Sequence, residues 1–463
     1  MTRLIQSISR NKGIWIILIA VIVIYGLLYT HIMRNFPDVV NGADHHWSTI
    51  GENLYRHGAY SLGKRDAQGE LIPTLFTPPI YPLLYAASFT IFGEGRMAHE
   101  AMRILQILMN IGIVLIVYHA GSAWNKRIGL AAAFFAATDL SMFYFANNYE
   151  SPHIALGFFV ALSMLFVIRF FKKRSSYTNI ILASLSLGLA VWTKEAAYLL
   201  WIPIAFTVFL WACYDAAYSI RKRALLAGFF ILIASSFFWG WKIRNYYATG
   251  SSAFTSHSGS AMLWSASYID VRQQGISFGK AYRAIQQKYI TDEVRQLSEG
   301  EQSRYLEEIA KKKILSSPVD YIIAMVKGWY PLMLGTFPPY AMYSSETTNQ
   351  LIERVSQLKG HRQLLPMLWE RGSYLYLALL ILPKLLLLIF YIASITGVWY
   401  MYRGKRDPWV LLTAVLIIGY TLAVTSPSSY SGYRTLGIPA FYILSGYGLI
   451  SFIEHSKRFR NLN

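Results

Sequence analysis

The sequence predicts an all-α polytopic membrane protein with about 10 transmembrane helices and further helices at the outer membrane surface, and three observations support the membrane class. Of the 463 residues, 54% are hydrophobic and 14% are charged, whereas a soluble domain carries about 25% charged residues. Ten stretches are apolar and close to the 20 or so residues that a helix needs to cross a bilayer. The formal charge is +19, and the chain has one cysteine. This composition excludes a disordered chain and a disulfide scaffold.

The ten apolar stretches are predicted to be transmembrane helices, and an even number places both termini on the same side. Between them, two long loops are expected on the opposite side, at about 34–103 and 242–373. The predicted spans cover about 14–33, 104–121, 128–146, 152–171, 178–193, 197–213, 224–241, 374–402, 409–425 and 434–453.

Basic residues fix the orientation of these spans. Short segments on the side of the termini contain 18 Lys and Arg residues, whereas the short loops 147–151 and 426–433 contain none. The positive-inside rule therefore predicts a cytoplasmic (inner) membrane protein with both termini in the cytoplasm. Most of the positive charge is explained by orientation, which argues against nucleic-acid binding. The basic segments are 3–12, 126–127, 169–174, 221–223, 403–406 and 457–460.

Three regions follow from this topology. Residues 1–241 form an N-terminal transmembrane module with the first outer loop, 242–373 an extracytoplasmic region with amphipathic helices, and 374–463 the C-terminal transmembrane helices. In the middle region, Ser298 and Glu301 have the spacing of a capping box. Ser317-Pro318 marks the start of another helix, with Ser317 as N-cap. The apolar segments 79–93 and 320–337 are expected to lie at the outer membrane surface rather than to span it.

Acidic residues in the outer loops are candidates for catalysis. Asp44 precedes an amphipathic stretch, where it can cap a helix and also be held for proton abstraction. Glu150 lies in a short outer loop before a span, where an acid favours the positive helix end. His45 and His46 adjoin Asp44, so Asp44, His45 and Glu150 are candidate ligands of a divalent cation such as Mg²⁺ or Mn²⁺. Ordinary interfacial histidines are the alternative.

Four cations lie on the outer side, against the orientation bias. Each alone is explained by a long side chain that extends to the membrane surface. Together they suit an anionic ligand, for which a lipid phosphate is the obvious candidate. These cations are Lys194, Lys242, Arg244 and Arg434.

Five stretches resemble motifs of the polyprenyl-phosphate-sugar-dependent glycosyltransferases of the GT-C superfamily. The likeness is to the bacterial family-39-like enzymes related to protein mannosyltransferases and to the lipid A aminoarabinose transferase. It runs discontinuously from about residue 14 to 260, and weakly at 433–439. The stretches are the acidic motif at Asp44, Thr77-Pro78-Pro79-Ile80-Tyr81-Pro82 through Gly93, Asn148-Tyr149-Glu150-Ser151-Pro152, Gly188-Leu189-Ala190-Val191-Trp192-Thr193-Lys194 and Trp241-Lys242-Ile243-Arg244-Asn245-Tyr246.

The resemblance implies transfer of a sugar from a polyprenyl-phosphate donor to an extracytoplasmic acceptor, by a single displacement that inverts the anomeric carbon. The acceptor could be a glycolipid, lipopolysaccharide, a wall polymer or a protein. Asp44 then corresponds to the general base and Glu150 to a second acid that orients the acceptor or a metal. The four cations correspond to the donor phosphate site, Arg434 less directly. The expected lining of the acceptor site is His45, His46, Tyr81 and Asn245.

The sequence departs from the family pattern at several positions. His45 stands where relatives often have Glu, and Thr77 where a basic residue often precedes the two prolines. Glu195 follows Lys194, and an ion pair between them would weaken the phosphate role of the lysine. Two other readings stay open, a flippase or transporter of an anionic amphipathic lipid and a ligase that uses a lipid-diphosphate donor. A non-catalytic scaffold is the remaining alternative.

Overall fold

The computed structural model describes residues 12–35, 46–147, 152–172, 176–214, 218–336, 374–405, 407–425, 427 and 430–460. Helices make up all the regular structure of these residues, apart from one isolated β-bridge between Arg65 and Leu71. The all-α prediction is therefore confirmed. The helices are α2 (Lys12–Asn35), α3 (His46–His57), α4 (Ile80–Phe92), α5 (Arg96–Gly121), α6 (Lys126–Thr138), α7 (Leu140–Asn147), α8 (His153–Lys172), α9 (Tyr177–Val191), η2 (Glu195–Ala197), α10 (Trp201–Tyr214), α11 (Ile220–Thr249), α12 (His257–Gln274), α13 (Phe278–Tyr289), α14 (Asp292–Gln296), α15 (Glu299–Ser316), α16 (Pro318–Leu334), α19 (Tyr374–Arg403), α20 (Pro408–Val424), η5 (Ser431–Leu436) and α21 (Ile438–Arg460).

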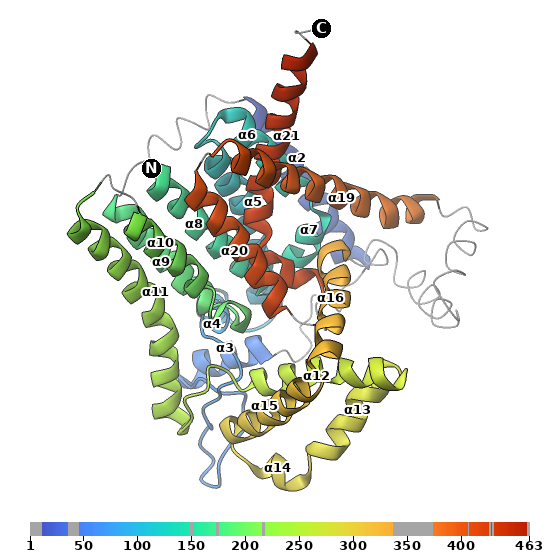
Figure 1. Ribbon diagram of the computed structural model, residues 1–463. Helices are drawn as coiled ribbons and strands as arrows, with labels where there is room; N and C mark the ends of the chain where they lie inside the picture. Colours follow the sequence, from blue (N-terminus) through green and yellow to red (C-terminus); the bar gives the residue numbers. More distant parts are fainter. Residues whose placement is uncertain are drawn as a thin grey trace.

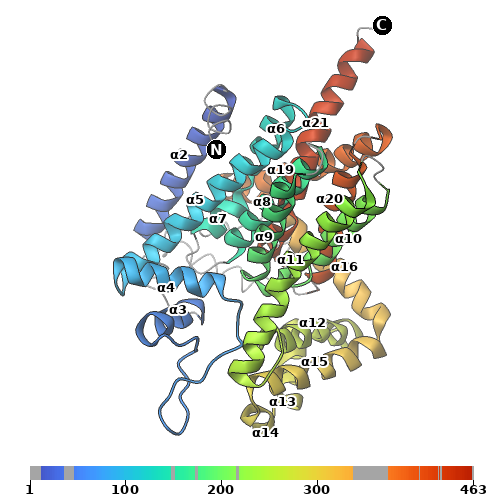
Figure 2. The same cartoon turned by 90° about the vertical axis from the view of Figure 1, so that its left-hand side faces the viewer.

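The molecule has two layers, a bundle of apolar helices and a smaller helical layer at one end of it (Figure 1). The bundle contains α2, α5–α11 and α19–α21. The layer contains α3, α4 and α12–α15, and α16 connects it to the bundle. The first turn of α2 and the last turns of α21 lie at the opposite end of the bundle (Figure 2). This arrangement agrees with two large loop regions on one side of a membrane.

Helical structure is present at each of the ten predicted spans, but the prediction that ten helices cross the membrane is not confirmed. Five helical segments of the described chain are long and apolar enough to cross a bilayer, and α6 with α7 would add a bent sixth. Helices α9 and α20 are apolar but shorter, as are α4 and the apolar part of α2. The multi-pass membrane class follows from these helices.

Close contacts between α19 and α21 rest on two glycines. A Cβ atom on Gly397 would overlap the backbone of Leu444, and one on Gly448 would overlap the backbone of Ala393. Ser394 of α19 also contacts Ser445 of α21, with their hydroxyl oxygens 2.6 Å apart. Small residues that let helix backbones approach are the usual means of packing helices in lipid.

The third predicted span, 128–146, is not one continuous helix. Helix α6 ends at Thr138, Asp139 takes an extended conformation, and α7 continues at an angle of 57°. The hydroxyl and backbone N–H of Ser141 both donate to the carboxylate of Asp139. This local bonding satisfies backbone groups at the break, which hydropathy alone cannot predict.

The smaller helical layer agrees closely with the predicted helix boundaries. Ser298 and Glu301 form the expected capping box at the start of α15. Ser317 precedes α16 and Pro318 is its first residue, although the Ser317 side chain makes no capping hydrogen bond. The apolar segments predicted to lie at the surface correspond to α4 and α16.

Candidate functional site

The end of α9, the start of α4 and helix α3 meet at one place. The backbone N–H of Ile80 donates to the carbonyl oxygen of Trp192 at 2.9 Å. The indole Nε1 of Trp47 donates to the hydroxyl of Thr77 at 3.0 Å. The first contact joins α4 to the end of α9, more than 100 residues away in the sequence, and the second joins α3 to the segment before α4. The chain from Trp192 to Lys194 lies at this junction.

Two further contacts hold the loop between α3 and α4 in this position. The carboxylate of Glu299, at the start of α15, accepts hydrogen bonds from the hydroxyl of Thr74 and the backbone N–H of Leu75, each at 2.9 Å. Nη1 of Arg244 donates to the carbonyl oxygen of Thr74 at 3.0 Å. The loop that precedes the Pro-Pro motif is therefore fixed by α15 and α11 together.

Lys194 is a buried cation at this junction. Its exposed fraction is 5%, and its Nζ lies 3.6 Å from a carboxylate oxygen of Glu195. The same Nζ lies 5.1 Å from the ring centre of Tyr433 and 6.0 Å from that of Trp47. An ammonium group has three donors, and Glu195 is its one carboxylate partner in the described part of the chain. The group can therefore donate further hydrogen bonds to an anionic ligand.

Sequence reasoning missed two side chains of this site, His257 and Tyr433. His257 begins α12, and burial lowers the pKa of its imidazole. The carboxylate of Glu195 raises that pKa, while the charges of Lys194 and His46 lower it further. Burial, and next the charge of Glu195, raise the pKa of the Tyr433 phenol. The imidazole and the phenol are therefore neutral at pH 7, close to one ion pair.

His153 supports Tyr433 from the other side. Its Nε2 lies 2.5 Å from the hydroxyl oxygen of Tyr430, and its ring centre lies 5.4 Å from that of Tyr433 in an edge-on arrangement. His153 is 2% exposed. It begins α8 directly after the Asn148–Pro152 stretch, so the second acidic motif leads to this cluster. We use the term Lys194 cluster for Lys194, Glu195, His257, Tyr433 and His153.

Arg434 does not lie on the outer surface as predicted, because it is 1% exposed and is paired. Its Nη2 lies 3.2 Å from the carboxylate of Asp139 and also donates to the hydroxyl of Ser141. Its Nη1 donates to the backbone oxygens of Met333 and Gly335 at 2.7 and 3.3 Å. The guanidinium thus joins the break between α6 and α7 to the end of α16, and this geometry gives it a structural role.

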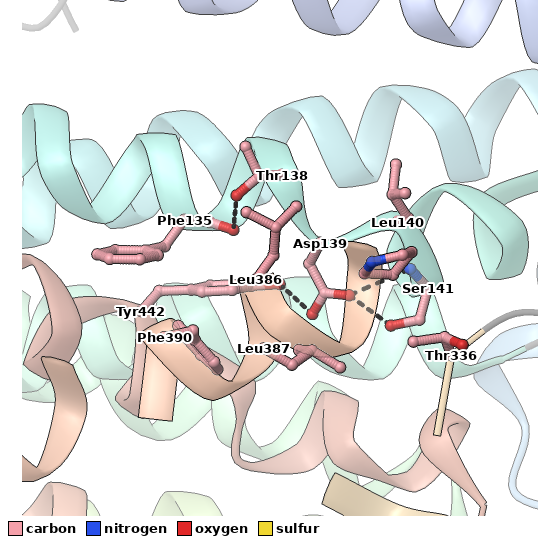
Figure 3. A pocket seen from close by; sticks show the side chains of 11 residues that line it. Phe135, Thr138, Asp139, Leu140, Ser141, Thr336, Leu386, Leu387, Phe390 and Tyr442 are labelled. Atoms are coloured by element: carbon pink, nitrogen blue, oxygen red, sulfur yellow. Dashed lines mark hydrogen bonds between the residues drawn. The ribbon is translucent and has the colours of Figure 1, made fainter. Parts of the chain in front are cut away.

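Asp139 lies beside a small cavity between α6, α7, α19 and α21 (Figure 3). Its carboxylate points toward Ser141 on one side and toward the hydroxyl of Tyr442, at 3.1 Å, on the other. With Arg434, these partners satisfy an acid that falls within the third predicted span, 128–146. A charge inside a membrane protein needs such partners.

The two cations of α11 have different surroundings. Lys242 lies 5.4 Å from the ring centres of Phe238 and Trp239, both on its own helix. Arg244 lies 4.7 Å from the ring centre of Tyr60, and it has no carboxylate partner among the described residues. No interaction of the described chain connects either cation with Lys194. Their predicted phosphate roles stay untested.

Of the predicted acceptor-lining residues, two are internal. Tyr81 is 1% exposed and its hydroxyl donates to Gln106 at 3.1 Å. Asn245 is 0% exposed, and its Nδ2 donates to the backbone oxygens of Ala253 and Phe254 at 2.8 and 3.1 Å. Both therefore stabilise the walls of the site rather than line it. His46 is exposed, with its ring 4.3 Å from that of Phe76.

Asp44, His45 and Glu150 lie outside the described residues. Their predicted catalytic and metal-binding roles are untested, and so is the N-cap role of Asp44. In the part of the chain that the structure describes, no three His, Cys, Asp or Glu residues are grouped as metal ligands. His46 alone of the proposed metal neighbourhood is described, and one imidazole is not a metal site.

Comparison with known protein families gives a match over the part of the chain that contains Lys194. The family model for dolichyl-phosphate-mannose-protein mannosyltransferase matches residues 77–241, which run from Thr77 through Lys194 to Trp241. No curated protein matches the chain. Two solved structures of the oligosaccharyltransferase AglB from Archaeoglobus fulgidus match it with TM-scores of 0.53 and 0.52, each at 13% identity. They cover 98% and 96% of this chain, and 51% of the archaeal protein in both cases.

The chain shares the fold of the archaeal oligosaccharyltransferase. The chain spans about half the length of the archaeal oligosaccharyltransferases that it matches. ArnT from Cupriavidus metallidurans overlaps less, with a TM-score of 0.37 at 14% identity over 94% of this chain and 78% of that protein. The similarity to the archaeal protein is one of fold, and Lys194 lies at the junction of three of the five motif stretches.

Proposed function

We propose that this GT-C protein is an integral-membrane glycosyltransferase that moves a sugar from a polyprenyl-phosphate donor to an acceptor on the outer side of the cytoplasmic membrane. The observation that carries the proposal is Lys194, a buried cation with one carboxylate partner at the junction of three motif stretches. The match to the mannosyltransferase model over 77–241 supports it. AglB, which has the same fold, was solved with dolichol phosphate and an inhibitory peptide.

The reaction would be one displacement at the anomeric carbon. The acceptor oxygen forms a bond to this carbon as the bond from the carbon to the phosphate oxygen breaks, so the configuration inverts. Asp44 takes the acceptor proton as general base. The departing lipid phosphate gains one negative charge, and Lys194 stabilises that charge in the transition state. Arg244 and Lys242 would bind the lipid phosphate before reaction, and Glu150 would orient the acceptor.

The orientation is part of the proposal. Both termini would be cytoplasmic, with the Lys194 cluster facing the periplasm or exterior. Support comes from the basic segments of the sequence and from the position of the ends of α2 and α21, opposite the layer that contains α12–α15. A cysteine-accessibility experiment that labels position 312 on α15 from inside, rather than outside, would contradict this orientation.

The test of function is mass spectrometry of membrane glycolipids from cells that carry the wild type or Lys194→Ala. The amount of glycosylated product is compared between the two. We expect product from the wild type and a loss of about 10²–10³-fold in Lys194→Ala, as for removal of one charge-stabilising donor. The control is Lys312→Ala, an exposed lysine of α15, which should keep full activity. Lipid movement across vesicles without any modified acceptor would instead favour a flippase.

A further inference from the structure

Helix α16 has an exposed apolar face, although it connects the smaller helical layer to the bundle. Four large apolar residues of this helix are 48–67% exposed, and they follow one another at intervals of three, four and four residues. With 3.6 residues per turn, this spacing keeps them within an arc of about 80° on the helix surface. We use the term α16 stripe for these residues, Val319, Ile322, Val326 and Tyr330.

The other side of α16 packs inside the protein. Ala324, Gly328 and Leu332 are buried, and their intervals of four residues place them away from the stripe. Lys327 is exposed, but it points about 100° from the middle of the stripe, and its long side chain can extend to a membrane surface. A surface helix ordinarily directs polar residues outward. The apolar outward face of α16 therefore indicates an apolar partner.

The C-terminal part of α16 is attached to the bundle. The indole Nε1 of Trp329 donates to the carbonyl oxygen of Leu422, near the end of α20, at 3.0 Å. The hydroxyl of Tyr391, within α19, donates to the carbonyl oxygen of Met333 at 2.8 Å. Nη1 of Arg434 donates to the same carbonyl oxygen. The last turns of α16 are therefore held among apolar helices of the bundle.

The contact with α20 sets the depth of α16 in a membrane. Leu422 lies fourteen residues after Pro408, about 21 Å along the axis of α20. The basic segment 403–406 directly before α20 marks one membrane surface. The hydrocarbon core is about 30 Å thick, so Trp329 lies about 9 Å inside its other surface. Any tilt of α20 places Trp329 deeper.

The α16 stripe extends from this depth toward the smaller helical layer. In Figures 1 and 2, α16 runs from that layer to the bundle, so its lower-numbered residues lie farther out. A rise of 1.5 Å per residue places Tyr330 and Val326 within the hydrocarbon and Ile322 close to its boundary. Val319 then lies among the lipid head groups. Most of the stripe is therefore at the depth of lipid chains.

Two observations favour lipid over a second protein as the partner of the α16 stripe. Helix α19, to which α16 is bonded through Tyr391, has an exposed apolar surface beside that bond, at Leu388 and Ile392. The stripe thus adjoins a part of the bundle that faces lipid. A stable contact between two proteins needs about 20–30 residues on each side, and the stripe has four.

We propose that the C-terminal half of α16 enters one leaflet of the membrane and that the α16 stripe binds lipid hydrocarbon there. The sequence predicted only that 320–337 lies at the membrane surface. Insertion of α16 rests on the multi-pass membrane class and is independent of the proposed glycosyl transfer. It fixes the smaller helical layer to the bilayer, because Asp320 near the start of α16 pairs with Arg272 of α12 at 2.6 Å.

The test uses the full chain in nanodiscs, with Cys213→Ser as the background because Cys213 is the one cysteine of the chain. Single cysteines replace Val326, Tyr330 or, as the control, the exposed Lys312 of α15. The probe is a charged maleimide that does not cross membranes. Thiolate is the reactive form, and hydrocarbon raises the pKa of a thiol. We expect Val326→Cys and Tyr330→Cys to react about tenfold or more slowly than Lys312→Cys, which corresponds to one pKa unit at pH 7.

A second readout distinguishes lipid from protein as the cover of the stripe. A fluorescent label on Tyr330→Cys should be quenched by lipids with brominated acyl chains, and the same label on Lys312→Cys should not. Equal reaction rates at the three positions would overturn the proposal, because the stripe would then lie in water. Slow reaction without quenching would also overturn it and would indicate cover by a second copy of the chain. Lys194→Ala should leave these results unchanged, so a failure of glycosyl transfer stays distinguishable.

Discussion

Lys194 and Arg434 are both buried cations in the same bundle of helices, with exposed fractions of 5% and 1%, yet their surroundings differ. Arg434 donates to a carboxylate, a hydroxyl and two backbone oxygens. Lys194 has one carboxylate at 3.6 Å and two aromatic faces. The guanidinium of Arg434 thus has its partners within the protein, whereas the ammonium of Lys194 can still donate hydrogen bonds to an anionic ligand.

The difference teaches how a structural cation can be distinguished from a ligand-binding one. A buried charge must be paired or solvated, because its transfer from water is unfavourable. Where the protein supplies every partner, removal of the charge affects folding. Where the partner set is incomplete, removal affects ligand binding. Substitutions at the two positions should therefore have opposite profiles of stability and activity.

The largest effect is expected from Arg434→Met, which leaves the carboxylate of Asp139 buried without its cation. Breaking a buried ion pair by removing one partner lowers the free energy of unfolding by about 3–5 kcal/mol. Chemical unfolding in detergent measures this value. The double variant Asp139→Leu/Arg434→Met should recover part of the loss, because it leaves no unpaired charge. Wild-type stability in Arg434→Met would contradict the structural role.

Glu195→Gln should strengthen the binding of lipid phosphate, and its free-energy effect should be smaller than that of Arg434→Met on unfolding. It removes the negative charge next to Lys194, so the site becomes more positive and should bind a lipid phosphate about tenfold more tightly, corresponding to about 1.4 kcal/mol. Equilibrium binding of a short-chain polyprenyl phosphate measures this. Slower turnover should accompany tighter product binding. Unchanged affinity would mean that Glu195 does not face the phosphate.

His257 should make stability depend on pH. Burial, with the charges of Lys194 and His46, lowers its folded-state pKa below the ordinary value of 6.5, and the charge of Glu195 opposes this only in part. Below about pH 6.5 the unfolded chain therefore binds a proton that the folded chain does not, and stability falls as the pH falls toward the folded-state pKa. His257→Gln should make the decrease in melting temperature between pH 7 and 5 shallower. His57→Gln, at an exposed site, is the matched control.

Lys242→Ala should have the smallest effect. Lys242 is half-buried, and its ammonium contacts two rings of its own helix, Phe238 and Trp239. Cation–π contacts at exposed sites contribute about 0.5–1 kcal/mol. Melting temperature should therefore change little, and binding of polyprenyl phosphate should change less than in Lys194→Ala. A loss of binding equal to that of Lys194→Ala would contradict the smaller share of phosphate binding that is proposed for Lys242.

Much of the fold was predictable from local patterns, since hydropathy marks each bundle helix and the capping box at Ser298 marks the start of α15. The break at Asp139 was not predictable, because its stabilising partner Arg434 lies 295 residues away in the sequence. For the same reason Arg434 was assigned to the surface. The basic-residue bias only shows that a cation is unexpected on the outer side, and it cannot say whether an acid from another helix pairs with it.

The candidate site was predicted in part. Lys194 was identified from its motif, and its pairing with Glu195 was anticipated as a possible complication. His257 was missed because it stands in a loop region without a recognisable motif, and only the packing of α12 brings it to Glu195. Tyr81 and Asn245 were assigned to the lining because motif residues were taken to face the site, whereas both side chains form hydrogen bonds inside the walls.

The most direct test of the central claim is the equilibrium binding of a short-chain polyprenyl phosphate to Lys194→Ala and to the wild type, with Lys312→Ala as control and the melting temperature of each protein measured in the same detergent. We predict that Lys194→Ala binds at least about tenfold more weakly, with a melting temperature close to that of the wild type. Unchanged binding in Lys194→Ala, or weakened binding only together with a large loss of stability, would contradict the claim that Lys194 holds the lipid phosphate.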